Sequence, residues 1–193
     1  MLERTTVDDL IARLQRGIEP PILAVDGLPC AGKSTMVGRL AEHIPLDCIC
    51  IDDFGRPDAE WPDRPGFPFE FVRYAEFQEA VRTLAATGTC SYRPFDWNTL
   101  AVSPVPRTVT LDRLVVVEGV SVLEPSLCPL YGLRVFVESD RASILATAIA
   151  RGDGMWEPAW RDLFMPSNDL YMATHPRDRA DLVLAGRGSA GTS

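Results

Sequence analysis

Lysine is almost absent from this sequence. Of the 19 basic residues one is a lysine, Lys33, and all the others are arginines. The Asn-Lys-x-Asp motif with which GTPases read guanine needs a lysine of its own. Because Lys33 stands in a Gly-Lys-Ser-Thr run instead, the sequence excludes a guanine-reading switch of that class.

The composition also has no excess of positive charge. There are 27 acidic and 19 basic residues, which gives a formal net charge of −8. Nucleic acids and anionic membranes attract proteins with basic surfaces, so we expect neither as a partner. Long apolar runs are missing as well, and no stretch reaches the roughly 20 residues that a membrane-spanning helix needs.

Paired cysteines are the third absence. The five cysteines form no C-x-x-C motif, and their odd number together with the lack of a signal peptide predicts reduced thiols in a cytoplasmic protein. Cys48 and Cys50 would share one face of a strand with no second ligand pair nearby. We therefore expect them to serve packing rather than a metal site.

Short apolar runs alternate with helical patterns along the 193 residues. The length predicts one domain, 1–193, and the alternation predicts a three-layer α/β fold with a mainly parallel sheet. Residues 1–19 should carry a packing helix, and 187–193 a flexible tail. We expect roughly five strands, at 22–25, 46–51, 114–117, 133–137 and 180–185, and further helices over 33–43, 69–87 and 141–151.

The most specific feature is a glycine loop between an apolar run and a helical pattern. It fits G-x-x-x-x-G-K-[ST] without mismatch. Glycines let successive backbone N–H groups wrap a phosphate chain, and the following helix directs its positive end toward the anion. Lys33 can reach the terminal phosphates and the Ser34 hydroxyl can bind Mg²⁺. The sequence thus predicts a P-loop NTPase fold that holds ATP and Mg²⁺ with a phosphate loop of nine residues: Gly27, Leu28, Pro29, Cys30, Ala31, Gly32, Lys33, Ser34 and Thr35.

Carboxylates follow two of the expected strands. Asp52 and Asp53 come after the strand at 46–51, and Glu118 follows the strand at 114–117. Ligands of open α/β sheets bind at the carboxyl ends of the strands. We therefore expect these acids beside the phosphate loop, where Glu118 can bind Mg²⁺ directly or through water.

Aromatic residues are frequent in the segments between these landmarks. Trp61 and Phe67 lie in a proline-rich loop, and Phe95 and Trp97 lie in a second loop over 90–99. Such side chains can bind a flat substrate group or fill the edge of the protein. Both interpretations stay open at this point.

The landmarks in their order resemble the uridine kinase and phosphoribulokinase family of P-loop kinases, to which nicotinamide riboside kinases also belong. The resemblance covers about 21–186 and is carried by VDGLPCAGKST, IDDF, YRPFDWNT, LVVVEGV, the RGDG break and ADLVLAG. It implies phosphoryl transfer from ATP-Mg²⁺ to a hydroxyl of a small molecule. It also implies a substrate-side segment over 54–100 and a lid region over 151–175.

The resemblance further implies roles for single residues. Asp52 matches the base toward the acceptor hydroxyl, and Lys33 and Arg151 match the other catalytic positions. Asp53 is the second choice for the base and, with Ser34 and Glu118, a candidate metal ligand. The acceptor is expected to contact Asp52, Tyr92, Phe95, Asp96 and an acid before the third helix, either Asp63 or Glu70.

Several alternatives stay open. The helix before the RGDG break has alanines and a threonine where the family often has arginines, so Arg161 is a second candidate for the lid. The chain could also be a nucleotide-binding regulator or a degenerate kinase. The acceptor (nucleoside, riboside, sugar or another metabolite), ATP or GTP as donor, and the oligomeric state, with a homodimer as one alternative, are not decided by the sequence.

Overall fold

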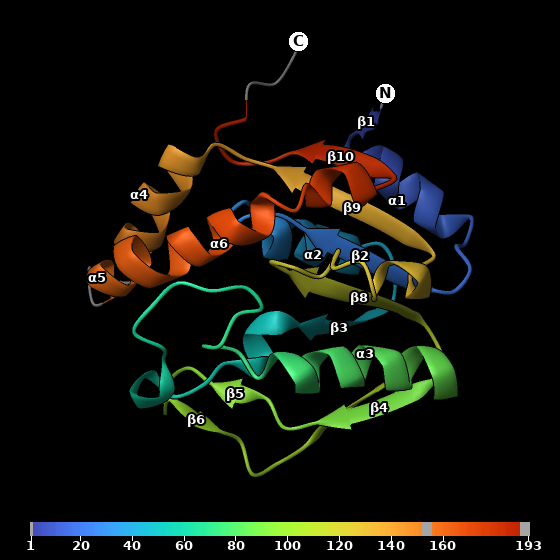
Figure 1. Cartoon of the computed structure of the whole chain (residues 1–193). Coiled ribbons are helices and arrows are strands. Elements are labelled where there is room, and N and C mark those ends of the chain that lie inside the picture. Colours follow the sequence, from blue (N-terminus) through green and yellow to red (C-terminus); the bar gives the residue numbers. More distant parts are fainter. Residues whose placement is uncertain (1, 152–155, 190–193) are drawn as a thin grey trace.

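A six-stranded parallel sheet forms the centre of the protein (Figure 1). The computed structural model describes residues 2–151 and 156–189. All neighbouring strands of this sheet pair in parallel. Their order is β1 (Glu3–Thr5), β10 (Leu182–Ala185), β9 (Leu133–Glu138), β2 (Ile22–Asp26), β8 (Leu114–Gly119) and β3 (Leu46–Cys50).

Two small antiparallel ladders lie beyond β3 in the chain. They pair β4 (Thr89–Tyr92) with β7 (Arg107–Thr110), and β5 (Phe95–Asp96) with β6 (Ala101–Val102). The helices are α1 (Val7–Gln15), α2 (Lys33–Ala41), α3 (Tyr74–Thr87), α4 (Arg141–Arg151), α5 (Glu157–Ala159) and α6 (Met165–Met172). Short helical turns are η1 (Ile51–Phe54), η2 (Asp58–Glu60), η3 (Cys128–Leu130), the π-helical η4 (Trp160–Phe164) and η5 (Pro176–Arg179).

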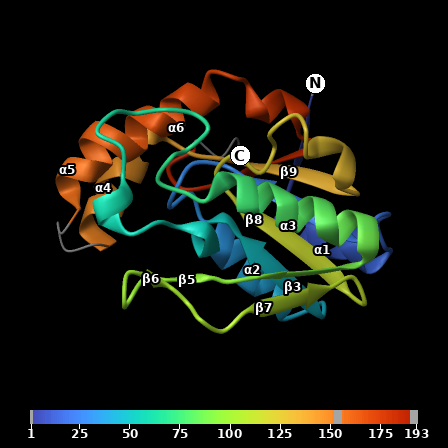
Figure 2. The same ribbon diagram turned by 60° about the horizontal axis from the view of Figure 1, so that its bottom comes forward.

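Each face of the sheet has its own apolar core. In β2 the side chains alternate: Leu23 and Val25 pack with α1, α2 and α4, whereas Ile22 and Ala24 pack with α3 and with Tyr171 of α6. This is the two-residue period of a strand buried on both faces. The three layers follow from it (Figures 1 and 2).

Capping residues mark the ends of two helices. Thr6 caps α1, because its hydroxyl accepts a hydrogen bond from the N–H of Asp9 at 3.1 Å. Gly88 ends α3 in the left-handed conformation that glycine adopts without strain. The strand ends point toward the side where α4, α5 and α6 lie (Figure 1), so the loops at this edge are free to form a site.

The predicted α/β fold with a mainly parallel sheet is confirmed, but the number of strands and the start of one helix differ from the prediction. The sheet has six strands rather than five, because Glu3–Thr5 pairs with β10 through the backbone and has no apolar pattern that could reveal it. The third helix starts at Tyr74 instead of residue 69, since Phe69 packs into the core before the helix and Arg73 is its N-cap.

Other predicted segments also differ in detail. Residues 90–99 contain the end of β4 and all of β5 rather than only a loop, and β7 was not predicted. In the expected tail, the backbone N–H of Arg187 donates to Ala31 O at 3.1 Å, so its first residues contact the phosphate loop. The glycines of the RGDG break and residues 190–193 lie outside the described residues.

Within the described part of the chain no helix is long and apolar enough to cross a membrane. All five cysteines are free thiols. Cys90 and Cys128 are buried, whereas Cys30, Cys48 and Cys50 are half-buried.

The glycines at 119 and 38 should respond to alanine in opposite directions. Gly119 ends β8 with φ +147°, and an added Cβ would collide with the side chain of Ile51. We expect Gly119→Ala to lower the free energy of unfolding by about 2–4 kcal/mol. Gly38 lies in α2 with open space around it, so Gly38→Ala should raise it by about 0.5–1 kcal/mol. Urea unfolding measures both, and a stable Gly119→Ala protein would contradict the packing described here.

Candidate active site

The phosphate loop links β2 to α2 with a backbone that few residues can adopt. Gly27 and Gly32 have φ values of +145° and +104°, and Cys30 also lies in the left-handed region at +55°. A Cβ on Gly27 would come within 2.5 Å of Val137 O in β9. The loop therefore packs closely on the sheet.

Lys33 closes over this loop. Its side chain is buried, with the residue 7% exposed, and the ammonium donates to Gly27 O at 3.0 Å and Leu28 O at 2.8 Å. An ammonium group carries three donors and no acceptor. The same three donors can turn to phosphate oxygens, so the only lysine of the chain is held where a triphosphate would lie.

Asp26 lies directly before the loop and is fully buried, with 0% of the residue exposed. Its carboxylate accepts hydrogen bonds from the N–H groups of Gly27 and Leu123 at 2.6 and 2.7 Å, and from the hydroxyl of Tyr171. Burial raises the pKa of Asp26, while these hydrogen bonds and the charge of Lys33 act in the opposite direction. The sequence contains Asp26 directly before the loop, but nothing in it assigns this role.

Ser34 and Glu118 meet at the predicted metal position. The Ser34 hydroxyl donates to Glu118 Oε1 at 3.0 Å, and the thiol of Cys50 donates to the same oxygen at 3.3 Å. Burial, with the charges of Asp52 and Glu118, raises the pKa of Cys50, so this thiol keeps its proton. The role of Cys50 was not predicted, because only the pairing of β3 with β8 brings it beside Glu118.

These residues fit a magnesium ion that is held mainly by nucleotide and water. Among the described residues no three His, Cys, Asp or Glu side chains gather in a metal-binding group. Mg²⁺ in phosphotransfer sites is bound by one or two protein oxygens together with phosphates and water. The hydroxyl of Ser34 in α2 and the carboxylate of Glu118 in β8 satisfy that requirement.

Asp52 follows β3 at the same edge of the sheet. The residue as a whole is exposed, but its carboxyl group lies among protein atoms and charged groups. Desolvation raises its pKa first, the charges of Glu118 and Asp53 add to the rise, and Lys33 and Arg151 oppose it. A carboxyl that binds a proton more readily than usual suits a group that accepts one during a reaction.

Asp53 lies with the substrate-side segment rather than with Ser34 and Glu118. Its carboxylate accepts a hydrogen bond from the Tyr92 hydroxyl at 2.8 Å and pairs with Arg107 at 3.3 Å. Burial and the charge of Asp53 raise the pKa of Tyr92, so the phenol stays a donor. Arg107 comes from the unpredicted strand β7, which explains why the sequence did not reveal this pairing.

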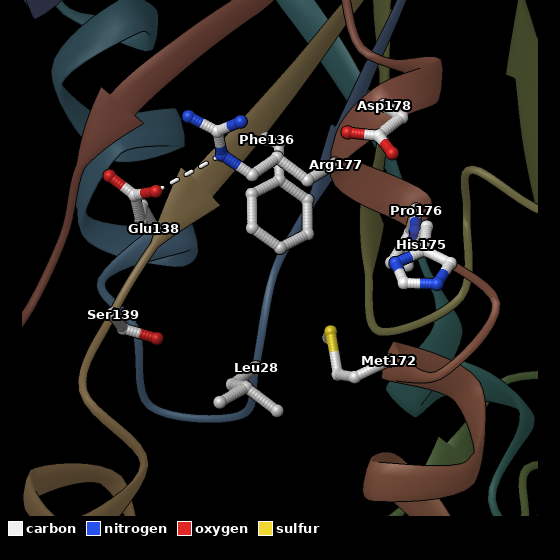
Figure 3. A pocket seen from close by; sticks show the side chains of 9 residues that line it. All are labelled: Leu28, Phe136, Glu138, Ser139, Met172, His175, Pro176, Arg177 and Asp178. Atoms are coloured by element: carbon white, nitrogen blue, oxygen red, sulfur yellow. Dashed lines mark hydrogen bonds and ion pairs between the residues drawn. The ribbon is translucent and has the colours of Figure 1, made fainter.

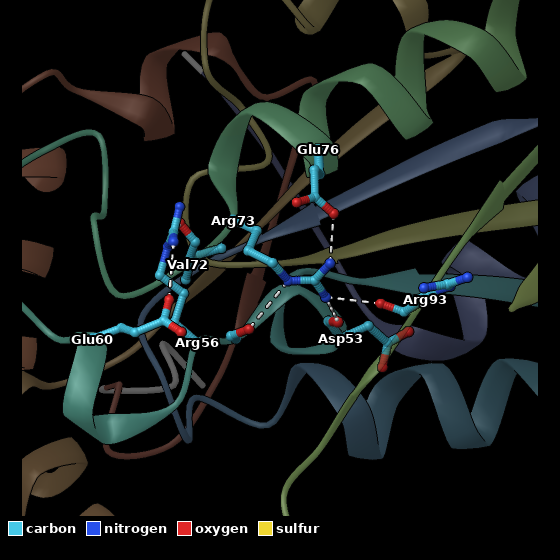
Figure 4. A network of polar contacts seen from close by, with 8 residues as sticks. Asp53, Arg56, Glu60, Val72, Arg73, Glu76 and Arg93 are labelled. Atoms are coloured by element: carbon cyan, nitrogen blue, oxygen red, sulfur yellow. Dashed lines mark hydrogen bonds and ion pairs between the residues drawn. The ribbon is translucent and has the colours of Figure 1, made fainter. Parts of the chain in front are cut away.

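Arg73 holds the turn that carries Asp52 (Figure 4). Its guanidinium donates to the carbonyl oxygens of Asp53, Gly55 and Arg93 at 3.0, 3.3 and 2.8 Å, and it pairs with Glu76. The backbone N–H of Arg73 donates to the carbonyl oxygen of Phe54, the last residue of the turn, at 2.7 Å. The turn, α3 and the segment after β4 are therefore joined through one side chain.

The four tryptophans of the chain are linked by aromatic contacts, and Trp97 connects them to this turn. Trp156 of the lid region lies 5.6 Å from Trp61 and 5.8 Å from Trp97, measured between ring centroids. Trp160 and Trp61 both pack on Phe164, at 5.1 and 4.8 Å. This tryptophan cluster joins the substrate-side segment to the lid region.

Trp97 links the tryptophan cluster to the predicted base. Its indole N–H donates to the backbone carbonyl of Asp52 at 3.0 Å, and the residue is 42% exposed. Phe95, which packs against Trp97, is itself buried.

The remaining predicted residues lie at different depths. Asp63 and Glu70 are exposed. Asp96 accepts from the N–H of Asn98 at 2.9 Å, and this hydrogen bond lowers its pKa. Of the phosphate loop, Leu28 and Ala31 are buried, Pro29 and Cys30 half-buried, and Ser34 and Thr35 exposed.

The two arginine candidates for the lid differ in position. Arg151 at the end of α4 reaches the phosphate loop, where its guanidinium lies 3.6 Å from the sulfur of Cys30. Arg161 pairs with Glu157 on the surface. The structure thus brings Arg151, and not Arg161, to the predicted site.

A cavity of about 300 Å³ borders the phosphate loop at Leu28 (Figure 3). Phe136 and Met172 line its apolar part, and the Glu138–Arg177 ion pair, 3.1 Å long, lines its wall. None of the predicted catalytic side chains lines it, so it is separate from the site around Asp52.

Solved structures of other proteins have a similar fold. A protein described as a possible uridine kinase from Bacillus stearothermophilus superposes with a TM-score of 0.69 at 20% identity, over 92% of this chain and 96% of that one. The chain has the fold of the P-loop kinases. Phosphoribulokinase from Rhodobacter spheroides gives 0.61 at 17% identity, over 90% and 72%. D-glycerate 3-kinase from Cryptococcus neoformans gives 0.52 at 12%, over 90% and 85%.

The expected resemblance is therefore confirmed for the P-loop kinase fold. No protein-family profile and no curated protein matches the sequence itself. At these identities the superpositions establish the fold and leave the substrate open. What the chain does must be argued from its own site.

Asp52 should lower the stability of the protein at neutral pH. A carboxyl whose pKa is raised by folding binds protons more tightly in the folded state, so its contribution is present in acid and lost as pH rises through the folded pKa. We expect Asp52→Asn to be more stable than wild type at about pH 7–8, with the gain vanishing near the unfolded pKa of about 4.

Asp112→Asn is the control for this measurement. Its hydrogen bond from Arg113 lowers the pKa of Asp112, so the variant should lose stability at neutral pH and match wild type in acid. Urea unfolding across this pH range, without nucleotide or magnesium, compares the three proteins. A destabilised Asp52→Asn protein at pH 7 would contradict the electrostatics of the site.

Proposed function

We propose that this protein is an ATP-dependent phosphotransferase that moves the γ-phosphate to a hydroxyl of a small metabolite. The observation that carries the proposal is the meeting of three groups at one sheet edge. Lys33 covers the phosphate loop, and Ser34 forms a hydrogen bond to Glu118. Asp52 lies close enough to Glu118 and Lys33 for their charges to act on its pKa. This combination provides for phosphate, metal and proton together.

In the proposed reaction the acceptor oxygen bonds to the γ-phosphorus while the bond from phosphorus to the β,γ-bridging oxygen breaks, and ADP leaves. Lys33 and the loop amides hold the phosphates, and Asp52 takes the hydroxyl proton. Mg²⁺, held by Ser34 and Glu118, supplies charge neutralisation. Arg151 stabilises the transferring group. Such transition states are loose, so positioning and electrostatics account for most of the rate.

For the acceptor we propose a ring-bearing molecule, such as a nucleoside, a riboside or a sugar. The exposed indole of Trp97, bonded to the carbonyl of Asp52, supports an aromatic surface next to the base. Asp63, which is exposed, and Asp96, which is half-buried, are proposed to contact the acceptor. The buried Tyr92 and Phe95 are proposed to shape the site, Tyr92 by holding Asp53. A location in the cytoplasm and a homodimer complete the proposal.

A nucleotide-binding regulator or degenerate kinase is the second candidate. It is favoured by α4, where four of the 11 residues are alanines and Arg141 pairs with Asp169. The experiment is to measure ADP release with Mg·ATP or Mg·GTP and a panel of hydroxyl compounds. Release that depends on an acceptor supports the kinase, whereas tight nucleotide binding with no acceptor-dependent release supports the second candidate.

Lys33→Ala should lose most of the activity. The variant removes one preorganised charge contact to the phosphates, which corresponds to about 2–4 kcal/mol of transition-state stabilisation, measured as kcat/KM with the best acceptor. Arg39→Ala is the matched control, because Arg39 lies on the same helix but pairs with Asp8 at the surface. Turnover of Lys33→Ala close to that of wild type would overturn the assignment of the phosphate loop.

Asp52→Asn should separate chemistry from nucleotide binding. We expect kcat to fall by at least about 100-fold, since a general base is lost, while the Kd for Mg·ATP changes little. Asp58→Asn, an exposed acid of the nearby turn η2, serves as control. The opposite result, lost nucleotide binding with normal turnover, would place Asp52 in the metal site.

A further inference from the structure

The buried carboxylate of Asp26 joins three separate parts of the chain. Oδ1 accepts from the N–H groups of Gly27, at 2.6 Å, and Ser121, at 3.3 Å. Oδ2 accepts from the N–H of Leu123, at 2.7 Å, and from the hydroxyl of Tyr171. These donors belong to the phosphate loop, to the turns after β8 and to α6. Each carboxylate oxygen therefore has two donors.

Tyr171 is itself fixed from several sides. The residue is 0% exposed, and its ring lies 5.0 Å from Phe67 and 6.4 Å from Phe69, both of the substrate-side segment. The guanidinium of Arg179 lies 5.9 Å from the centre of the ring and donates to Leu123 O. One side chain thus touches the acceptor side directly and the phosphate loop through Asp26.

The buried carboxylate of Asp26 needs hydrogen-bond donors because of its position next to the phosphate loop. A carboxylate one residue before a phosphate-binding loop repels a triphosphate unless donors compensate it, and a buried charge needs such donors in any case. Three of the four donors are backbone N–H groups. The fourth, the hydroxyl of Tyr171, comes from a residue 145 positions away. Without it Oδ2 keeps one donor, and the carboxylate that accepts from the Gly27 N–H loses one of its four contacts.

We propose that Tyr171 is a positioning residue that acts through Asp26 to hold the first turn of the phosphate loop in the geometry that binds a nucleoside triphosphate. The inference rests on the proposed function. It assigns no contact between Tyr171 and the nucleotide. It also connects α6, which lies in the lid region, to the phosphate loop through Asp26.

Tyr131 provides a matched control within the same core. The residue is 7% exposed, and its hydroxyl donates to Val122 O at 3.0 Å, between the two residues after β8 that bond to Asp26. Tyr131→Phe removes the same atom and a hydrogen bond to the same segment, but leaves Asp26 untouched. The pair of variants therefore separates a general loss of core hydrogen bonding from an effect on the phosphate loop.

The test is calorimetric titration of the full chain with Mg·ATP and with the non-hydrolysable analogue Mg·AMP-PNP. We expect Tyr171→Phe to raise Kd about tenfold or more, in line with losing a hydrogen bond to a charged group, and Tyr131→Phe to stay within about twofold of wild type. Equal Kd values for the two variants would overturn the inference. Wild-type protein that binds neither ligand would instead overturn the proposed function, so the two failures are distinguishable.

A double-mutant cycle tests the route through Asp26. Asp26→Asn should also weaken nucleotide binding, and the double variant Asp26→Asn/Tyr171→Phe should bind no more weakly than Asp26→Asn alone, because both changes affect one contact. Additive effects would contradict an action of Tyr171 through Asp26. If Tyr171→Phe does not fold, Asp26→Asn takes its place against Tyr131→Phe, with the same expected tenfold loss and the same criterion.

Discussion

The parallel pairing of β2 with β8, and of β8 with β3, is the constraint on which the site depends. In this register Asp26 lies opposite Gly119, and Cys50 lies opposite Glu118. The three strands therefore end at the same level. The phosphate loop, the metal-side carboxylate and the turn with Asp52 leave the sheet as neighbours although they are far apart in the sequence.

This convergence gathers acidic groups around one lysine, and the protein treats the acids differently. Asp26 is buried beneath the loop and surrounded by four hydrogen-bond donors, so its charge is compensated by fixed groups. Burial raises the pKa of both carboxyl groups, but the charges of Glu118 and Asp53 add to the rise at Asp52, whereas hydrogen bonds and the charge of Lys33 oppose it at Asp26. A carboxylate held by four hydrogen bonds organises structure, whereas one whose pKa is raised further by neighbouring acids is suited to accept a proton. The same residue type thus serves two purposes at one sheet edge.

The substrate-side segment is held by side-chain contacts rather than by pairing with the central sheet. Here short strands and loops are held by Arg73, by the Asp53–Tyr92–Arg107 contacts and by the tryptophan cluster. These interactions tie the turn with Asp52 to the lid region through side chains rather than through a sheet. A site assembled in this way can change its specificity by side-chain substitution while the phosphate side stays the same.

Local patterns in the sequence determined the phosphate loop, the main strands and the acids at their ends, because a glycine spacing, an apolar run and a strand boundary each lie within a few neighbouring residues. The tertiary structure alone decided that Glu3–Thr5 joins the sheet, that Asp53 faces Tyr92 and Arg107, and that Tyr171 reaches Asp26. Those contacts join residues that lie far apart in the chain, from 39 positions for Asp53 and Tyr92 to 179 positions for Glu3 and Leu182. No local pattern records them, because each partner's side chain is ordinary in its own segment and acquires its role only when folding brings the other beside it.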